Sequence, residues 1–157
     1  MNNQNAAVQP LRFAATILSL IFLSACSSFD HDWNRSESQA NAATDALIGR
    51  WAGTWRSEPT GHDGKLRCII TAATDSIVNQ YVARYHATWW DVLSGEFTVP
   101  LAVEKQDGEY RFRGEFDLGM LAGGVYRYEG HVRAVEMHVN YVSKGDHGVY
   151  QLRKIAD

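Results

Sequence analysis

From Leu47 to the C-terminus, apolar and polar residues alternate with a period of two, and this alternation constrains the fold more than any other feature of the sequence. Such alternation is typical of half-buried β-strands, because successive side chains of a strand point to opposite faces of a sheet. Turn-forming residues divide the region into eight segments. The predicted strands are 47–56, 65–74, 77–89, 96–105, 109–117, 124–132, 135–143 and 147–155.

Eight short strands in roughly 110 residues predict an all-β fold, a mostly antiparallel meander that closes on itself as a small barrel. Closure is favoured because it removes the exposed sheet edges that an open meander would leave. The barrel domain is expected over residues 46–157, and no helix is predicted within it.

The turns predict how neighbouring strands pair. Asp107-Gly108 is the strongest hairpin signal, and a two-residue turn there places Val103 opposite Phe112. The other pairs predicted for this hairpin are Val99 with Phe116 and Glu104 with Arg111. A turn at Arg133-Ala134 predicts the pairs Glu129 with His138, His131 with Glu136 and Tyr128 with Val139. A four-residue loop over 144–147 predicts the pairs Tyr141 with Tyr150 and Val139 with Leu152.

All three hairpins place the large apolar residues on one face, which is the predicted interior. The other face carries arginines, histidines and further polar residues, so a polar exterior is expected rather than a lipid-facing one. The predicted interior consists of Trp51, Trp55, Leu66, Cys68, Ile70, Tyr81, Tyr85, Phe97, Val99, Leu101, Val103, Phe112, Phe116, Tyr126, Tyr128, Val139, Tyr141, Tyr150 and Leu152.

The start of the first predicted strand reads Gly49-Arg50-Trp51, followed by Gly53 and Trp55. This run resembles the G-x-W motif that opens the first strand of lipocalin-like (calycin) barrels. The resemblance covers residues 47–155 through the number and order of the strands. It implies that Trp51 packs at a closed end of the barrel.

Six tyrosines fall on the predicted interior, with Tyr110 at its rim. A buried phenol needs a hydrogen-bond partner, which a ligand or ordered water can provide. An eight-stranded barrel holds either side chains or one small ligand, so both interpretations stay open. The candidate ligand-binding tyrosines are Tyr81, Tyr85, Tyr128 and Tyr141.

Two loops combine glycines with adjacent His and Asp residues, Thr60-Gly61-His62-Asp63-Gly64 and Lys144-Gly145-Asp146-His147-Gly148. They become neighbours if the first and last strands pair. One hypothesis is a shared site at the rim of the barrel, in which His62 and His147 act as ligands or as a general base oriented by a carboxylate. The alternative is ordinary turn chemistry, since Asp and Gly favour tight turns.

The sequence offers little support for catalysis, cofactors or nucleic acid. It contains no nucleophile elbow, HExxH, phosphate-binding loop or paired Cys/His zinc signature, so no enzyme activity, metal or cofactor is expected. Three outer-face histidines, His86, His131 and His138, are interpreted as surface residues, because the predicted register gives two of them carboxylate partners. The net charge of −3 argues against nucleic-acid binding.

The first 25 residues have the form of a secretory signal peptide. Arg12 precedes an apolar run over 13–23, which is shorter than the roughly 20 residues that cross a bilayer. The following Leu23-Ser24-Ala25-Cys26 resembles the lipobox of bacterial lipoproteins. The resemblance implies that Cys26 is lipidated and becomes the first residue of the mature chain, with two or more acyl chains holding it in a membrane. It also implies outer-membrane localisation facing the periplasm, because Ser27 rather than Asp follows the cysteine.

Residues 26–45 are expected to form the lipidated cysteine and a flexible tether, and Cys68 is left as a free thiol. The chain is thus expected to be an envelope lipoprotein with a non-enzymatic barrel that binds a small apolar or aromatic ligand. The alternative is a structural or interaction lipoprotein whose packed barrel docks an envelope protein.

Overall fold

The computed structural model describes residues 28–36, 45–74, 80–90, 93–119 and 124–156. The chain divides into two compact units, Met1–Asn34 and Arg35–Asp157. Cys26 and the predicted signal peptide lie outside the described residues. Among the described residues, no helix has the length and hydropathy needed to span a membrane.

Residues 28–36 form a helix within the segment that was expected to be a flexible tether. Asp30 lies in its first turn, where negative charge favours helix formation. Phe29 and Trp33, one turn apart, stack with their ring centroids 5.8 Å apart. These local signals are too short to produce a sustained apolar period, which is why the sequence pattern did not indicate the helix.

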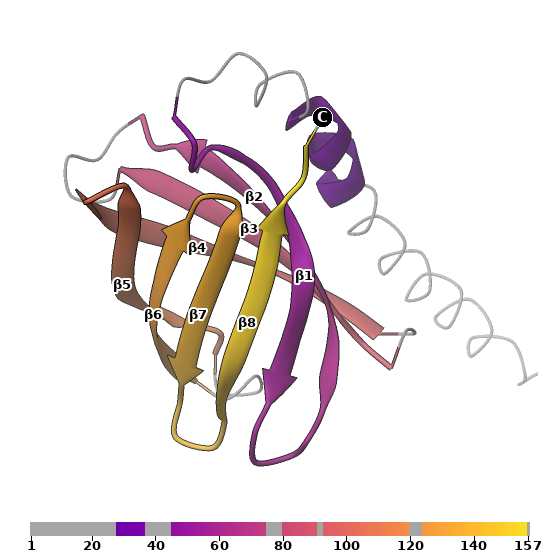
Figure 1. Cartoon of the computed structure of the whole chain (residues 1–157). Helices are drawn as coiled ribbons and strands as arrows, with labels where there is room; N and C mark the ends of the chain where they lie inside the picture. The colour runs from indigo at the N-terminus through magenta and orange to yellow at the C-terminus, as the bar shows by residue number, and fades with distance from the viewer. Residues whose placement is uncertain (1–27, 37–44, 75–79, 91–92, 120–123, 157) are drawn as a thin grey trace, which may run out of the picture. The chain divides into compact units, whose positions relative to one another are not determined.

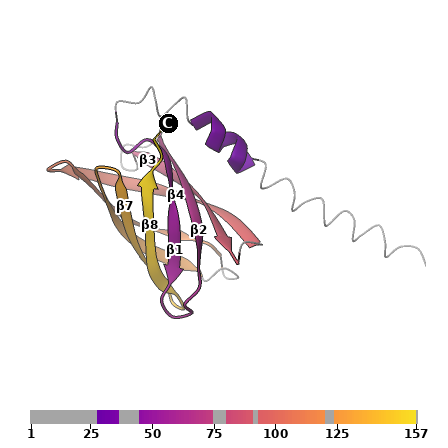
Figure 2. The same cartoon turned by 45° about the vertical axis from the view of Figure 1, so that its right-hand side comes forward.

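The second unit contains eight antiparallel strands that form a closed barrel in the order β1 to β8, with β8 paired to β1 (Figures 1 and 2). The all-β meander predicted from the sequence is confirmed. The strands are β1 (Gly49–Ser57), β2 (Asp63–Ala72), β3 (Tyr81–Trp89), β4 (Leu93–Gln106), β5 (Glu109–Asp117), β6 (Val125–Arg133), β7 (Glu136–Val142) and β8 (His147–Lys154).

The register of the β4–β5 hairpin is as predicted near its turn, where Val103 pairs with Phe112 and Glu104 with Arg111. The ladder ends at Ala102 and Arg113, so it does not reach the predicted pair of Val99 with Phe116.

The predicted registers of the last two hairpins are wrong by two residues. In the β6–β7 hairpin His131 pairs with His138, and in the β7–β8 hairpin Tyr141 pairs with Gly148. The β6–β7 turn is Ala134-Val135 rather than Arg133-Ala134, with Ala134 at a φ of 53°. The β7–β8 loop is 143–146 rather than 144–147. A shift of two residues keeps every side chain on its face, so the apolar pattern cannot distinguish the two registers.

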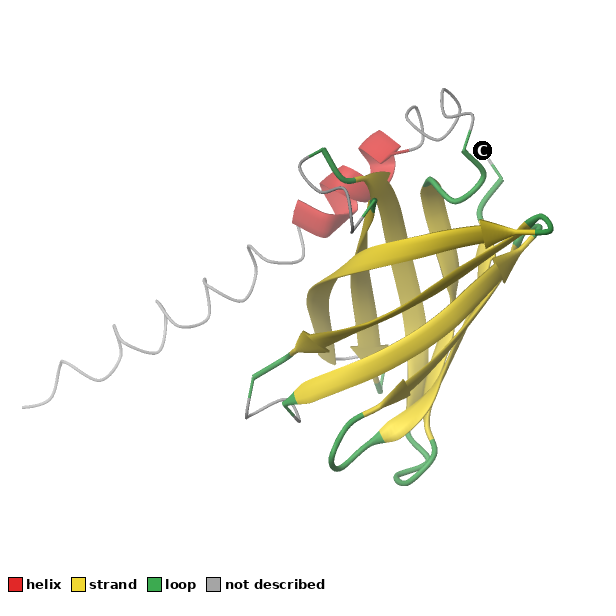
Figure 3. Ribbon diagram, turned by 90° about the vertical axis from the view of Figure 1, so that its left-hand side faces the viewer, coloured by secondary structure: helices red, strands yellow, loops and turns green. Residues whose placement is uncertain are grey.

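The predicted interior is confirmed, since all of its residues belong to the hydrophobic core or pack directly against it. The strands wrap around this core in a single layer, as Figure 3 shows. The core also contains Leu47, Tyr110, Val132 and Met137, which lie near the ends of strands where the alternation is hardest to follow.

Closure between β1 and β8 depends on Gly53, which pairs with Leu152. A Cβ atom at Gly53 would overlap the carbonyl oxygen of Gln151. The two strands can therefore approach this closely only because residue 53 has no side chain.

The β4–β5 contact is the shortest ladder of the barrel, with five residue pairs against seven to nine in the others. Beyond it, the Tyr128 hydroxyl reaches over from β6 and donates a hydrogen bond to the carbonyl of Pro100 on β4. The tyrosine crosses β5 at Gly114, where any side chain would collide with its hydroxyl. A side chain thus satisfies a backbone acceptor that the ladder leaves free.

Candidate functional site

The two ends of the barrel differ, and one of them is closed. At the end where β1 begins, Leu47, Trp51 and Leu101 are fully buried. The Trp51 indole Nε1 donates a hydrogen bond to the Leu47 carbonyl at 3.0 Å. Trp51 therefore occupies a closed end, as the resemblance to lipocalin-like barrels implied.

Asp45 joins three segments at this closed end through hydrogen bonds. Its carboxylate accepts hydrogen bonds from the hydroxyls of Tyr81 and Tyr110, the latter at 2.9 Å, and from the backbone N–H of Leu47 at 3.0 Å. Partial burial opposes ionisation of Asp45, but the three donors outweigh it and lower the pKa of the carboxyl below its ordinary value. Burial and the adjacent carboxylate raise the pKa of Tyr81 to about 12. No sequence pattern pointed to Asp45, because it stands before the first strand.

The opposite end, which we call the mouth, is more open. It is formed by the connections β1–β2, β3–β4, β5–β6 and β7–β8. Several inward-facing residues near the mouth are only partly buried although they belong to the interior. They are Trp89, Phe97, Phe116, Leu118 and Tyr150. This end is therefore less completely buried than the closed end.

Six aromatic rings form a closed belt inside the barrel near the mouth, one from each of the strands β3 to β8. We call this set the aromatic belt, and its members in order are Tyr85, Phe97, Phe116, Tyr126, Tyr141 and Tyr150. Successive ring centroids are 5.0, 5.5, 5.7, 5.9 and 5.0 Å apart, and Tyr150 returns to Tyr85 at 5.9 Å. These spacings are typical of favourable aromatic pairs.

Two hydroxyls of the belt make no hydrogen bond within the described part of the chain, those of Tyr126 and Tyr150. Burial, followed by the neighbouring phenols and Asp146, raises the pKa of Tyr150, so its hydroxyl stays protonated. The belt therefore combines apolar ring surface with two hydroxyl groups that can still bind a partner.

A hydrogen-bond network joins the belt to the rim. The Asp146 carboxylate accepts hydrogen bonds from the Ser57 hydroxyl at 2.6 Å and from the Tyr141 hydroxyl at 3.3 Å. Thr60 donates to the Ser57 hydroxyl at 2.8 Å. Burial and the proximity of Asp146 raise the pKa of Tyr141. The β7–β8 loop is thus tied to the end of β1.

The structure brings the loops of His62 and His147 together but separates their side chains. The carbonyl of His62 accepts a hydrogen bond from Ser57 N–H at 2.8 Å, and that of His147 accepts one from Glu58 N–H at 2.9 Å. The His62 ring lies edge-on against Trp90, with centroids 5.1 Å apart. His147 Nε2 lies 3.3 Å from the Glu58 carboxylate.

The four candidate tyrosines are spread over the barrel. Tyr85 and Tyr141 belong to the belt, whereas Tyr81 lies at the closed end with Asp45. Tyr128 lies beside the belt, with its ring 5.8 Å from that of Phe116, and its hydroxyl is held by Pro100. Tyr85 shares a hydrogen bond with the buried thiol of Cys68, and burial raises the pKa of that thiol.

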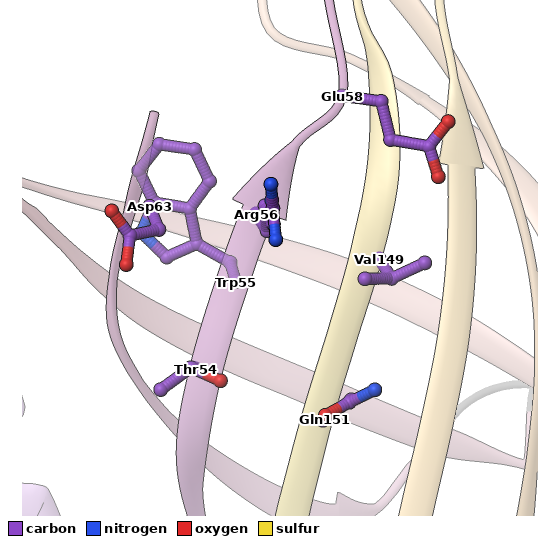
Figure 4. Close-up of a pocket in the computed structure, with 7 residues that line it drawn as sticks. All are labelled: Thr54, Trp55, Arg56, Glu58, Asp63, Val149 and Gln151. Atoms are coloured by element: carbon purple, nitrogen blue, oxygen red, sulfur yellow. The ribbon is translucent and has the colours of Figure 1, made fainter. Parts of the chain in front are cut away.

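The outer wall carries shallow grooves. One of about 600 Å³ lies over β1 and β8, lined by Thr54, Arg56, Val149 and Gln151, with Glu58 and Asp63 at its end (Figure 4). Its walls mix charged and apolar groups.

The prediction that His131 and His138 face carboxylates is wrong, because the corrected register places the two histidines opposite each other. Their rings stack with centroids 5.4 Å apart. Within the described ranges, no group of three or more His, Cys, Asp or Glu side chains is placed to hold a metal ion.

These features define a small closed antiparallel β-barrel with one sealed end and an aromatic-lined mouth. Comparison of the chain with family models, with curated proteins and with solved structures finds no match.

Proposed function

We propose that the chain is an envelope lipoprotein whose barrel is a non-enzymatic binding module for a small apolar or aromatic molecule. The ligand enters at the mouth and lies against the aromatic belt. The observation that carries this proposal is that Phe97, Phe116 and Tyr150 face inward yet remain partly exposed.

Burying these ring surfaces under a ligand is favourable, at about 25 cal/mol for each Å² of apolar surface removed from water. The free hydroxyls of Tyr126 and Tyr150 can orient a polar group of the ligand. A mostly apolar site with a few polar groups is the usual composition of small-molecule sites.

The test uses the full chain and a neutral fluorescent probe, N-phenyl-1-naphthylamine, whose emission rises in apolar surroundings. Replacement Phe116→Leu removes one ring of the belt, and Phe112→Leu removes a buried ring outside it. We expect Phe116→Leu to raise the probe Kd about fivefold or more, in line with the energy of an aromatic pair. Phe112→Leu lowers the Tm similarly but leaves the Kd within about twofold. Equal effects on the Kd, or no probe binding by the wild type, would contradict the proposal.

We also propose that His62 and His147 contribute to binding from the rim. The double variant with both residues replaced by Ala is expected to weaken probe binding more than it lowers the Tm, because both side chains lie on surface loops. A drop of several degrees with unchanged affinity would show that the histidines only stabilise their turns.

The anchor is proposed to be Cys26, on the basis of the lipobox resemblance, with outer-membrane localisation from Ser27. Labelled palmitate should be incorporated into the wild type and not into Cys26→Ala. Membrane fractionation should recover the wild type with the outer membrane. Equal labelling of both chains would refute the anchor and leave the binding proposal standing.

A second function is favoured by two exposed apolar residues at the β3–β4 hairpin. Trp90 is 63% exposed and Leu93 is 56% exposed. They could dock an envelope protein partner if the barrel binds no small molecule. Replacing both with Ser would then abolish co-purification of that partner, whereas a ligand-binding barrel would keep its probe affinity.

A further inference from the structure

The interior near the mouth carries no positive charge among the described residues. The inward-facing described positions there are mostly aromatic, aliphatic, glycine or serine, and their ionisable groups besides phenols are the carboxyl of Asp146 and the buried thiol of Cys68 beside Tyr85. The two inward lysines lie at the closed end, where Lys154 is 5.7 Å from the Trp51 ring and Lys105 is 4.9 Å from the Tyr110 ring.

Four successive rings of the belt, from Tyr85 to Tyr126, stack on one another with interplanar angles of 16°, 5° and 17°. The rings of Tyr141 and Tyr150 are tilted against their neighbours by 32° to 51°, and the face of an aromatic ring is electron-rich. A cation within about 6 Å of such a face is attracted to it, and cages of several rings bind quaternary ammonium groups. Tyr150 also offers a hydroxyl oxygen that is not engaged by another described residue.

Asp146 adds a negative charge at the edge of the belt. Its carboxylate bonds the Tyr141 hydroxyl at 3.3 Å, and it acts on the pKa of both Tyr141 and Tyr150 in the direction expected from an anion nearby. Its electrostatic field therefore extends over two rings of the belt.

The connections around the mouth are acidic as well. Glu58 lies in the β1–β2 connection, and Asp63 and Asp117 lie at the strand ends beside it and beside the β5–β6 connection. Lys144 is the one lysine or arginine within the described parts of these connections. Glu58 lies 3.3 Å from His147 and Asp63 pairs with Arg56 across the β1–β2 ladder, so the excess of negative charge at the rim is small.

We propose that the ligand is an organic cation, a small molecule with an alkylated ammonium group that lies against Tyr126, Tyr141 and Tyr150 of the aromatic belt and is paired electrostatically with Asp146. This inference rests on the proposed function. A carboxylate ligand such as a fatty acid would be repelled by Asp146, and a neutral ligand would bury ring surface without gaining any attraction to Asp146.

The experiment compares three probes of similar shape that differ in charge: benzyltrimethylammonium, neopentylbenzene and phenylmethanesulfonate. Each displaces N-phenyl-1-naphthylamine from the full chain at low and high salt. We expect the ammonium to bind about tenfold more tightly than the neutral probe, with the sulfonate weakest. Equal affinity of the ammonium and the neutral probe, or tighter binding of the sulfonate, overturns this inference and leaves the binding barrel intact. If none of the three displaces the bound N-phenyl-1-naphthylamine, this inference fails and the binding barrel stands; if N-phenyl-1-naphthylamine itself does not bind, both proposals fail.

Variants of Asp146 and Tyr126 test whether the preference for the ammonium probe over the neutral probe arises at this site. Asp146→Asn is expected to reduce the ratio of neutral to ammonium Kd about threefold or more, whereas Glu136→Gln, on the outer wall beside Arg153, leaves it unchanged. Because each variant is judged by a ratio between two probes, a loss of stability does not mimic the effect. Tyr126→Leu serves as a second test that leaves the rim network intact, and it should lower the same ratio. An unchanged ratio in both variants overturns the assignment.

Discussion

A single carboxylate, Asp45, connects the start of the barrel to two tyrosines that come from different strands. Replacement Asp45→Asn keeps the shape but loses the charge and leaves one phenol with a poorer acceptor. We expect a loss of about 1 to 2 kcal/mol in the free energy of unfolding at pH 7, measured by urea titration. The control Asp107→Asn, at an exposed turn where φ is 52°, should change stability by less than about 0.5 kcal/mol, since Asn tolerates that conformation.

Asp45 also makes the free energy of unfolding depend on pH in the acid range. The folded pKa of Asp45 lies below its ordinary value of 3.8, so its contribution is present above that value and is lost as the pH falls through the folded pKa. The difference in stability between wild type and Asp45→Asn should therefore shrink between pH 5 and pH 2. A constant difference over this range would show that the charge of Asp45 is unimportant.

At the scale of strands, barrel closure is expected to be most sensitive at Gly53. A side chain there would overlap the backbone of β8, which cannot move without breaking the β1–β8 ladder. Gly53→Ala should cost about 2 to 4 kcal/mol, measured by urea unfolding. In the matched variant Gly145→Ala the new Cβ meets no atom within 4 Å, and a change below about 0.5 kcal/mol is expected. Similar values for the two variants would contradict the close approach of β1 and β8.

The strands themselves were largely predictable from the sequence, because a period of two identifies both the strands and the face that they bury. Register was less predictable. Asp107-Gly108 specifies its turn chemically, whereas Ala134-Val135 has no residue that signals a turn, and a slip of two residues preserves the pattern.

The candidate site was only partly predictable for a related reason. The sequence indicated that the tyrosines face inward, but not which end of the barrel each one reaches. The tilt of the strands decides this, and it places Tyr81 at the closed end and Tyr85 in the belt. The aromatic belt is formed by residues from six strands, so no local sequence pattern predicts it.

For the whole molecule, buried phenols predict a loss of stability in alkali. The pKa values of Tyr81 and Tyr128 are raised to about 12, in both cases chiefly by burial. In the unfolded chain these hydroxyls ionise near pH 10, while the folded barrel keeps them protonated. Their stabilising effect is complete below pH 10 and is lost as the pH rises to about 12. The urea midpoint should therefore fall over this window, and tyrosinate absorbance should show a delayed fraction that titrates normally in urea. A single titration near pH 10 in the folded protein would contradict the burial of these rings.

The short β4–β5 ladder gives the barrel wall an unequal resistance to opening. The other seven strand pairs have ladders of seven to nine residue pairs, whereas β4 and β5 share only five. The stacked rings of Phe97 and Phe116 and the hydrogen bond from the Tyr128 hydroxyl to Pro100 add to this contact. Thermal fluctuations part a closed sheet first where the fewest backbone bonds must break. Amide protons at the β4–β5 contact should consequently exchange with deuterium before those of β6 to β8. The strands β4 and β5 can separate there while the rest of the barrel stays folded.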